Sequence, residues 1–228
     1  MKPIIVYHGS KVKIEKPLKA SGKSYNDYGQ GFYCTENESL SAEWACSTKN
    51  DGIVNKYSLD LKGLKVLKLN KDFSILNWLA ILLDNREPNV TEMAKISREY
   101  ILKEFLIDYK NFDVIIGYRA DDAYFTFVNE FINNQTNLDV LTNAMYLGKL
   151  GLQVFIQSDR AFKHLTFLSE KFVEYTEYNL KYQERVNEAN TDYRVMKNNN
   201  PLKGIFIRDV INRGVKNEDG IIPKIKIK

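Results

Sequence analysis

The sequence has few of the residues that build metal sites and disulfide-stabilised folds. Its 228 residues include only two cysteines, Cys34 and Cys46, and only two histidines. A zinc site needs about four cysteine, histidine or carboxylate ligands at close spacing, so we expect no bound metal. Two buried thiols are more common than a disulfide in a cytosolic protein, and we expect reduced cysteines, with a disulfide as the alternative.

Long hydrophobic runs are also missing. A membrane helix needs roughly 18 or more apolar residues in a row, but the longest block, residues 75–83, contains Asn77 and precedes Asp84. The first ten residues do not have the apolar stretch of a secretory signal. Hydrophobic residues make up 44% of the chain and charged residues 27%, as in ordinary globular domains. We therefore expect a cytoplasmic protein with one domain, residues 1–228, and no membrane partner.

The charge is distributed unevenly, although the net charge is only +4. Residues 1–70 contain 11 lysines and 7 acidic residues, and residues 200–228 contain 7 basic and 3 acidic residues. Basic ends can attract the phosphates of a nucleotide or a nucleic acid, or they can serve solubility alone. No RNA-recognition or zinc-finger signature decides between these two interpretations.

Short β-branched and aromatic runs alternate with segments of helical periodicity. We expect strands at residues 4–7, 31–35, 54–60, 65–69, 113–117, 153–157 and 204–207. We expect helices at residues 39–48, 74–85, 91–110, 122–133, 138–147 and 170–197. The irregular order, without a βαβ repeat, predicts an α+β fold with a helical insertion at about 70–110 and a helical C-terminal appendage at about 170–200.

The common nucleotide-binding and hydrolase motifs are missing as well. There is no Gly-Lys-Ser/Thr after a glycine-rich stretch, no GxGxxG after a strand and no GxSxG. The remaining candidates are polar and aromatic residues at strand ends, where binding residues often lie. His8 and Gly9 close the first strand, and Tyr33 and Trp44 could hold a planar ring between them. Each of these residues, taken alone, is better explained by a structural role in the core.

In combination, these residues form a more specific pattern. Tyr-His-Gly is followed by Gly-Phe-Tyr-Cys-Thr, with a serine 8 and a tryptophan 11 positions after the second tyrosine. This pattern resembles the NAD-binding core of ADP-ribosyltransferases, in the diphtheria-toxin and poly(ADP-ribose) polymerase branch with its His-Tyr-Glu signature. The segments GFYCTENESLSAEWA, FDVIIGYRADDAYF and AMYLGKLGLQVF look like an uncharacterised bacterial family of that superfamily, often found in toxin–antitoxin or phage-defence neighbourhoods. The wider resemblance covers about residues 4–60 and 150–160, and the narrower one nearly the whole chain.

The resemblance implies a split-β core of two small antiparallel sheets and a role for each matching residue. His8 would bind the adenosine-side ribose of NAD, and the backbone of Gly9 would hold the nicotinamide carboxamide. Tyr33 would stack on the nicotinamide ring, Ser41 would bind its amide, and Trp44 stands where the family has a second tyrosine. An indole keeps the aromatic face, so stacking is retained.

The sequence departs from the family at the third signature position. The family's glutamate supports positive charge on the ribose and binds its 2′-hydroxyl, but here the position is Gln153. A glutamine can bind a hydroxyl but cannot act as a general base. Asp121 and Asp122 are the best substitute carboxylates, and Arg119 could reach a phosphate. The alternative is that one of the two aspartates caps the following helix.

The resemblance therefore implies a mono-ADP-ribosyltransferase-like enzyme that uses NAD as its substrate and releases nicotinamide. The acceptor would be a macromolecule, either protein or nucleic acid, with a small molecule as the alternative. An NAD glycohydrolase and an inactive NAD- or ADP-ribose-binding module are the alternatives, the second because of Gln153. A third alternative is that the long tyrosine-rich helix binds a partner, such as a small antitoxin.

Overall fold

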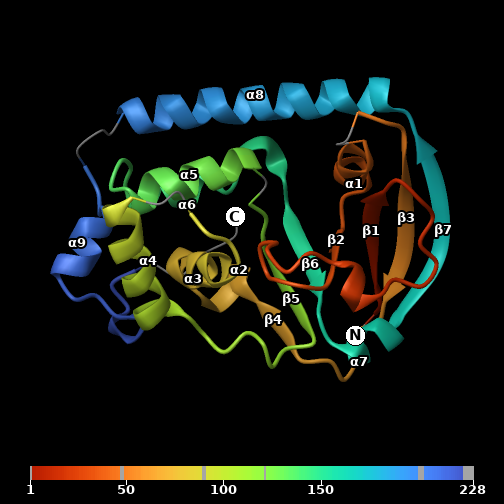
Figure 1. Cartoon of the computed structure of the whole chain (residues 1–228), viewed down its shortest axis with the longest axis horizontal. Helices are drawn as coiled ribbons and strands as arrows, with labels where there is room; N and C mark the ends of the chain where they lie inside the picture. Colours follow the sequence, from red (N-terminus) through yellow and green to blue (C-terminus); the bar gives the residue numbers. More distant parts are fainter. Residues whose placement is uncertain (1, 47–48, 89–90, 121, 200–202, 223–228) are drawn as a thin grey trace.

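The computed structural model describes residues 2–46, 49–88, 91–120, 122–199 and 203–222 (Figure 1). The strands are β1 (Ile4–Ser10), β2 (Phe32–Thr35), β3 (Gly52–Leu59), β4 (Val66–Lys68), β5 (Val114–Tyr118), β6 (Leu152–Ile156) and β7 (Leu165–Val173). The α-helices are α1 (Glu38–Ala45), α2 (Leu69–Asp72), α3 (Ile75–Asn85), α4 (Glu92–Phe105), α5 (Asp122–Ile132), α6 (Leu138–Ala144), α7 (Asp159–Lys163), α8 (Tyr175–Asn199) and α9 (Ile207–Asn212). Short 3₁₀ turns lie at η1 (Lys19–Ser21), η2 (Leu147–Lys149) and η3 (Asn217–Asp219).

Seven strands of the described chain form one sheet in the order β4-β5-β6-β2-β1-β3-β7. Neighbouring strands are antiparallel, except for the parallel pair β4 and β5. One half of the sheet is β4-β5-β6-β2 and the other is β1-β3-β7. Within the described residues the two halves meet at one registered pair, Tyr7 of β1 and Thr35 of β2. The α+β class is thus confirmed, but the two expected sheets are the halves of a single sheet.

Most of the helices lie on the β4 and β5 side of the sheet, whereas the edge strand β7 lies on the opposite side (Figure 1). Helices α3 to α6 gather beside β4 and β5, and α8 runs along the molecule past both α5 and α1. The two faces of the sheet pack against different hydrophobic clusters, as the side chains of β6 show. Phe155 packs with residues of α3 to α6, whereas Val154 and Ile156 pack with Val6 and Tyr57. Side chains alternate between the two faces along a strand, so Gln153 points to the same face as Phe155.

Local capping explains several helix starts. The side chain of Asn37 accepts a hydrogen bond from the amide of Leu40 at 3.1 Å, as expected for the residue before α1. Thr91 accepts one from the amide of Ala94 at 3.0 Å and starts α4. Cys34 and Cys46 are both buried and free, as expected. In the part of the chain described, no helix is both long and apolar enough to cross a bilayer.

Two sequence predictions at the C-terminal side are wrong. Residues 204–207 are not a strand, because Phe206 makes an isolated bridge to Asn137 and Ile207 already begins α9. The predicted helix 170–197 begins instead at Tyr175, and residues 170–173 end the edge strand β7. Charged residues on this strand hide its alternation, because most of its side chains face solvent.

Candidate functional site

A cavity of about 870 Å³ brings together most of the residues that the sequence analysis selected. Its lining includes His8 of β1, Tyr33 of β2, Trp44 of α1 and Gln153 of β6, together with Arg119 after β5. Cavities of this size are common for small-molecule and cofactor sites. Four separate elements therefore contribute predicted residues to one site.

Strand pairing explains why residues distant in sequence converge. In the β2–β6 pair, Tyr33 is opposite Phe155 and Thr35 is opposite Gln153. The ring centroids of Tyr33 and Phe155 are 4.6 Å apart, so the tyrosine ring packs against the buried ring of Phe155. The hydroxyl of Tyr33 donates to the carbonyl of Gly29 at 2.5 Å and accepts from the amide of Tyr28 at 3.1 Å. Tyr33 is therefore held in place before any ligand binds.

His8 is oriented by a backbone contact across the strands. Its Nδ1 lies 2.7 Å from the carbonyl oxygen of Tyr33, and its ring centroid lies 4.3 Å from that of Phe32. A carbonyl oxygen only accepts, so Nδ1 carries the proton. Burial lowers the pKa of His8 below 6.5, although the bond to Tyr33 opposes this shift. The neutral ring therefore offers Nε2 as an acceptor, which suits a ribose hydroxyl.

Gln153 has an amide oxygen that the fold leaves unsatisfied. The side chain is 6% exposed, and its Oε1 has no hydrogen-bond partner among the described residues. Buried polar atoms almost always have a partner, so an unsatisfied one that lines a cavity indicates a ligand contact or a water. This oxygen can accept a hydrogen bond from a hydroxyl.

Trp44 and Arg119 contact each other directly. The guanidinium carbon of Arg119 lies 3.9 Å from the centroid of the Trp44 ring, in a cation–π contact. A ligand ring at Trp44 would use the other face of the indole or displace Arg119. The two roles expected for these residues, ring stacking and phosphate binding, therefore belong to one adjoining pair.

Ser41 does not fit the role expected for it. The residue is fully buried and lies outside the cavity lining, and its hydroxyl donates to the carbonyl of Glu38 at 2.7 Å. Gly9 does line the cavity, but it also allows α1 to pack on β1. A Cβ at Gly9 would lie 1.9 Å from the carbonyl oxygen of Ser41, which no side chain could tolerate. Packing thus explains both residues.

The two expected substitute carboxylates are not placed at the cavity. Asp121 lies outside the described residues, and Asp122 is the first residue of α5, with a side chain that is also not described. Glu36, an acidic residue before α1, is exposed and not part of the lining. His164 directly follows α7, and its Nδ1 lies 3.0 Å from the carbonyl oxygen of Asp60, so this histidine has a structural role.

Asp27 is a cavity residue that the sequence analysis missed. It is 6% exposed, and its carboxylate accepts from Arg86 at 3.0 Å and from the amide of Ala120 at 2.9 Å. Burial raises the pKa of Asp27, although the Ala120 amide and Arg86 oppose the shift. The contact ties the loop before β2 to the chain that follows β5. Asp27 is in a loop without a motif, so no local signal reveals it.

Helix α8 also contributes to the cavity. Tyr182 of α8 lies in the lining, as does Glu43 of α1. The carboxylate of Glu43 accepts a hydrogen bond from Nε of Arg185 at 2.8 Å, in an ion pair whose side chains are 8% and 11% exposed. The long helix is thus joined to the site through a largely buried charge pair. Only tertiary packing creates this contact, since 142 positions separate the two residues.

A basic segment, residues 11–25, forms another side of the cavity. Val12, Ile14, Lys16, Leu18 and Lys23 all belong to the lining. The segment is held on β3, because the amide of Ile14 donates to Asn55 at 2.7 Å and Tyr57 donates to the carbonyl of Ile14 at 2.5 Å. Its far end packs against Gly31, where a Cβ on Gly22 would lie 2.2 Å from the Gly31 carbonyl oxygen.

Comparison with known proteins identifies a family but no function. No curated protein and no solved structure gives a significant match to this sequence. One family model, described as a protein of unknown function (DUF3990), matches residues 4–167. This range contains β1 to β6 and every residue that the sequence analysis assigned to the site. The chain belongs to the DUF3990 family.

Proposed function

We propose that this protein is an NAD-consuming mono-ADP-ribosyltransferase. The observation that carries the proposal is the convergence of His8, Tyr33, Trp44 and Gln153 on one cavity. These residues were selected from a family resemblance, and they come from four different elements of the fold. The cavity volume of about 870 Å³ also lies in the range of sites for large small-molecule ligands.

The chemistry of the lining suits a dinucleotide. Tyr33 and Trp44 offer aromatic faces to the nicotinamide ring. His8 Nε2 accepts from a ribose hydroxyl, and Gln153 Oε1 accepts from the 2′-hydroxyl of the ribose that reacts. Arg119 and Lys23 bring positive charge for the diphosphate. In the reaction, the acceptor bonds to C1′ of the ribose and the glycosidic electron pair leaves with the nicotinamide nitrogen.

Gln153 defines the kind of acceptor that this site favours. It holds the ribose but cannot remove a proton from the nucleophile, so the acceptor must be nucleophilic on its own. A poor acceptor would leave water as the nucleophile, which is the glycohydrolase alternative. The same residue is the observation that favours the inactive NAD- or ADP-ribose-binding module, since a neutral amide stabilises a ribosyl cation less than a carboxylate does.

The deciding experiment is incubation of the purified chain with NAD that is labelled in its adenine half, with and without cell lysate. We expect nicotinamide release that depends on Gln153 and label in a macromolecular fraction. Free ADP-ribose in place of labelled macromolecules would establish the glycohydrolase. NAD binding without nicotinamide release would establish the binding module.

We also propose that the enzyme acts in the cytoplasm as a toxin or defence effector, controlled by a small protein partner. Consumption of NAD or modification of an essential acceptor would stop growth. Expression of the wild-type chain in bacteria should therefore arrest growth, and expression of the Gln153→Ala variant should not. Equal growth of both strains at equal protein levels would contradict this role.

A further inference from the structure

The basic segment carries more positive charge than a bound dinucleotide requires. Residues 11–25 contain five lysines and a single acidic residue, Glu15. Lys16 and Lys23 line the cavity beside Arg119, and these three groups already match a diphosphate. The other three lysines, Lys11, Lys13 and Lys19, lie outside the lining.

Two of these outer lysines are not neutralised by the fold. The side chains of Lys11 and Lys19 are exposed and make no hydrogen bond or ion pair with the described residues. Lys13 differs, because it is paired with Glu15 at 2.8 Å and with Glu170 at 3.1 Å. Lys11 and Lys19 also flank lining residues, Val12 and Leu18 respectively. Unpaired positive charge therefore borders the cavity.

An exposed aromatic side chain lies on the same segment. Tyr25 is 62% exposed, and the amine of Lys23 lies 5.6 Å from the centroid of its ring. Proteins bind single-stranded nucleic acids with a basic groove that follows the phosphates and aromatic side chains on which bases stack. Lysines and an accessible ring beside a cavity reproduce both parts of that arrangement.

We infer that the acceptor is a single-stranded nucleic acid, which the basic segment binds with phosphates on Lys11 and Lys19 and a base on Tyr25. This inference rests on the proposed function, because the bound strand presents a base to the NAD in the cavity. A nitrogen of the base bonds to C1′ of the ribose, and the bond to nicotinamide breaks with its electron pair on the nicotinamide nitrogen. The proton of the attacking N–H passes to water.

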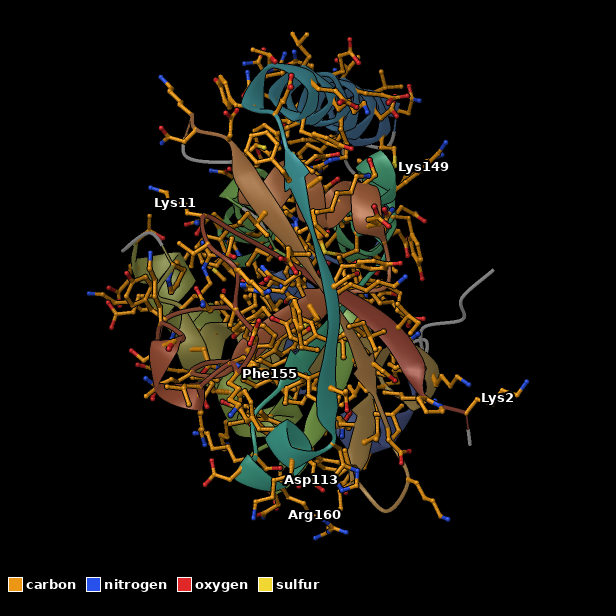
Figure 2. The ribbon with its side chains drawn as sticks, turned by 90° about the vertical axis from the view of Figure 1, so that its right-hand side faces the viewer. Lys2, Lys11, Asp113, Lys149, Phe155 and Arg160 are labelled. Carbon is orange, nitrogen blue, oxygen red and sulfur yellow. The ribbon has the colours of Figure 1, made fainter. Side chains whose placement is uncertain are left out.

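Binding is tested first, without NAD, by fluorescence anisotropy with labelled single-stranded RNA and DNA oligonucleotides. The test variant is Lys11→Gln with Lys19→Gln. The control is Lys2→Gln with Lys149→Gln, two exposed lysines that Figure 2 shows on the opposite side of the molecule from Lys11. We expect the test variant to bind on the order of tenfold more weakly, with a salt slope smaller by about 1.4, and the control to match the wild type.

The aromatic part of the inference has its own matched pair. Tyr25 and Phe172 are both 62% exposed, but Phe172 lies on the edge strand β7. Tyr25→Ala should weaken oligonucleotide binding by about fivefold or more, and Phe172→Ala should not change it. The inference would be overturned if the Lys11/Lys19 and the Lys2/Lys149 variants lost the same oligonucleotide affinity, or if the wild type bound no oligonucleotide.

Transfer is tested second, with labelled NAD and each oligonucleotide, followed by nuclease or protease. We expect label that nuclease removes, less label with the Lys11/Lys19 variant, and unchanged nicotinamide release in the absence of oligonucleotide. Label that only protease removes would show a protein acceptor and overturn the inference while leaving the proposed function intact. Oligonucleotide binding without any nicotinamide release would instead contradict the proposed function, and with it the assignment of the strand as acceptor.

Discussion

The cavity has two unlike sides. The strand wall consists of His8, Tyr33 and Gln153, whose positions are fixed by sheet register and backbone hydrogen bonds. The loop side consists of the basic segment and Asp27, which are held by a few side-chain contacts. Sheet pairing holds the three side chains of the strand wall in fixed positions, which suits the cleavage of one specific bond. The loop side instead brings charge and exposed surface, which suits recognition of a partner.

The largest expected effect is on the strand wall. Gln153→Ala should lower nicotinamide release by about a hundredfold, because the contact that orients the reacting ribose is lost. Its unfolding free energy should hardly change, since Oε1 makes no bond within the described fold. Gln157→Ala, just past the other end of β6, is the control, because its amide donates to the carbonyls of Tyr109 and Phe112. That variant should lose about 1–3 kcal/mol of stability but keep its turnover when folded.

Gln153→Glu sharpens the same test. We expect it to retain nicotinamide release and to increase cleavage by water, because a carboxylate stabilises the ribosyl cation and can activate water. Transfer to a negatively charged acceptor should fall. Equal nicotinamide release by the wild type and by both Gln153 variants would remove this residue from the site.

The next effect concerns the loop side. Asp27→Ala should cost about 3 kcal/mol in unfolding free energy, because the Arg86 charge loses its carboxylate partner and the Ala120 amide loses its acceptor. Urea unfolding measures this. Glu177→Ala breaks the exposed pair with Lys181 and should cost much less, because a solvent-exposed ion pair contributes little to stability. Similar losses for the two variants would mean that Asp27 does not hold the loop side in place.

Trp44→Ala should weaken NAD binding by roughly 1–3 kcal/mol, through loss of an aromatic platform. Calorimetry on the folded variant measures the change, and Arg119→Ala separates the contribution of the adjoining cation. Unchanged affinity in Trp44→Ala would exclude the indole from ligand binding.

The smallest effect is a pH dependence at His8. Its folded pKa is lowered by burial, so stability is fully present above pH 6.5 and is lost as the pH falls toward the folded pKa. Nicotinamide release should fall at lower pH, as the pH passes the folded pKa of His8, because protonated Nε2 no longer accepts. Thermal unfolding of His8→Asn should show a flatter pH profile than the wild type. Parallel profiles for the wild type and His8→Asn would contradict this assignment.

The strand wall could be predicted from the sequence, and the loop side could not. The family resemblance selected His8, Tyr33 and Gln153, and all three lie in short strands whose register determines where they meet. Asp27 and Tyr182 reach the cavity only through packing of a loop and of a long helix, which local sequence does not encode. The same limit explains β7, where exposed charges conceal a strand. Ser41 shows the opposite error, because its expected role came from the family and the packing of α1 buries it.

Titration of tryptophan fluorescence with NAD tests the central claim most directly. The chain has two tryptophans, and Trp78 is fully buried with its indole nitrogen donating to the Tyr118 carbonyl, outside the cavity lining. A ligand in the cavity therefore reports through Trp44. We predict saturable quenching in the wild type and none in Trp44→Phe, which retains Trp78. No saturable change in the wild type, or the same change in both proteins, would contradict an NAD site at the strand wall.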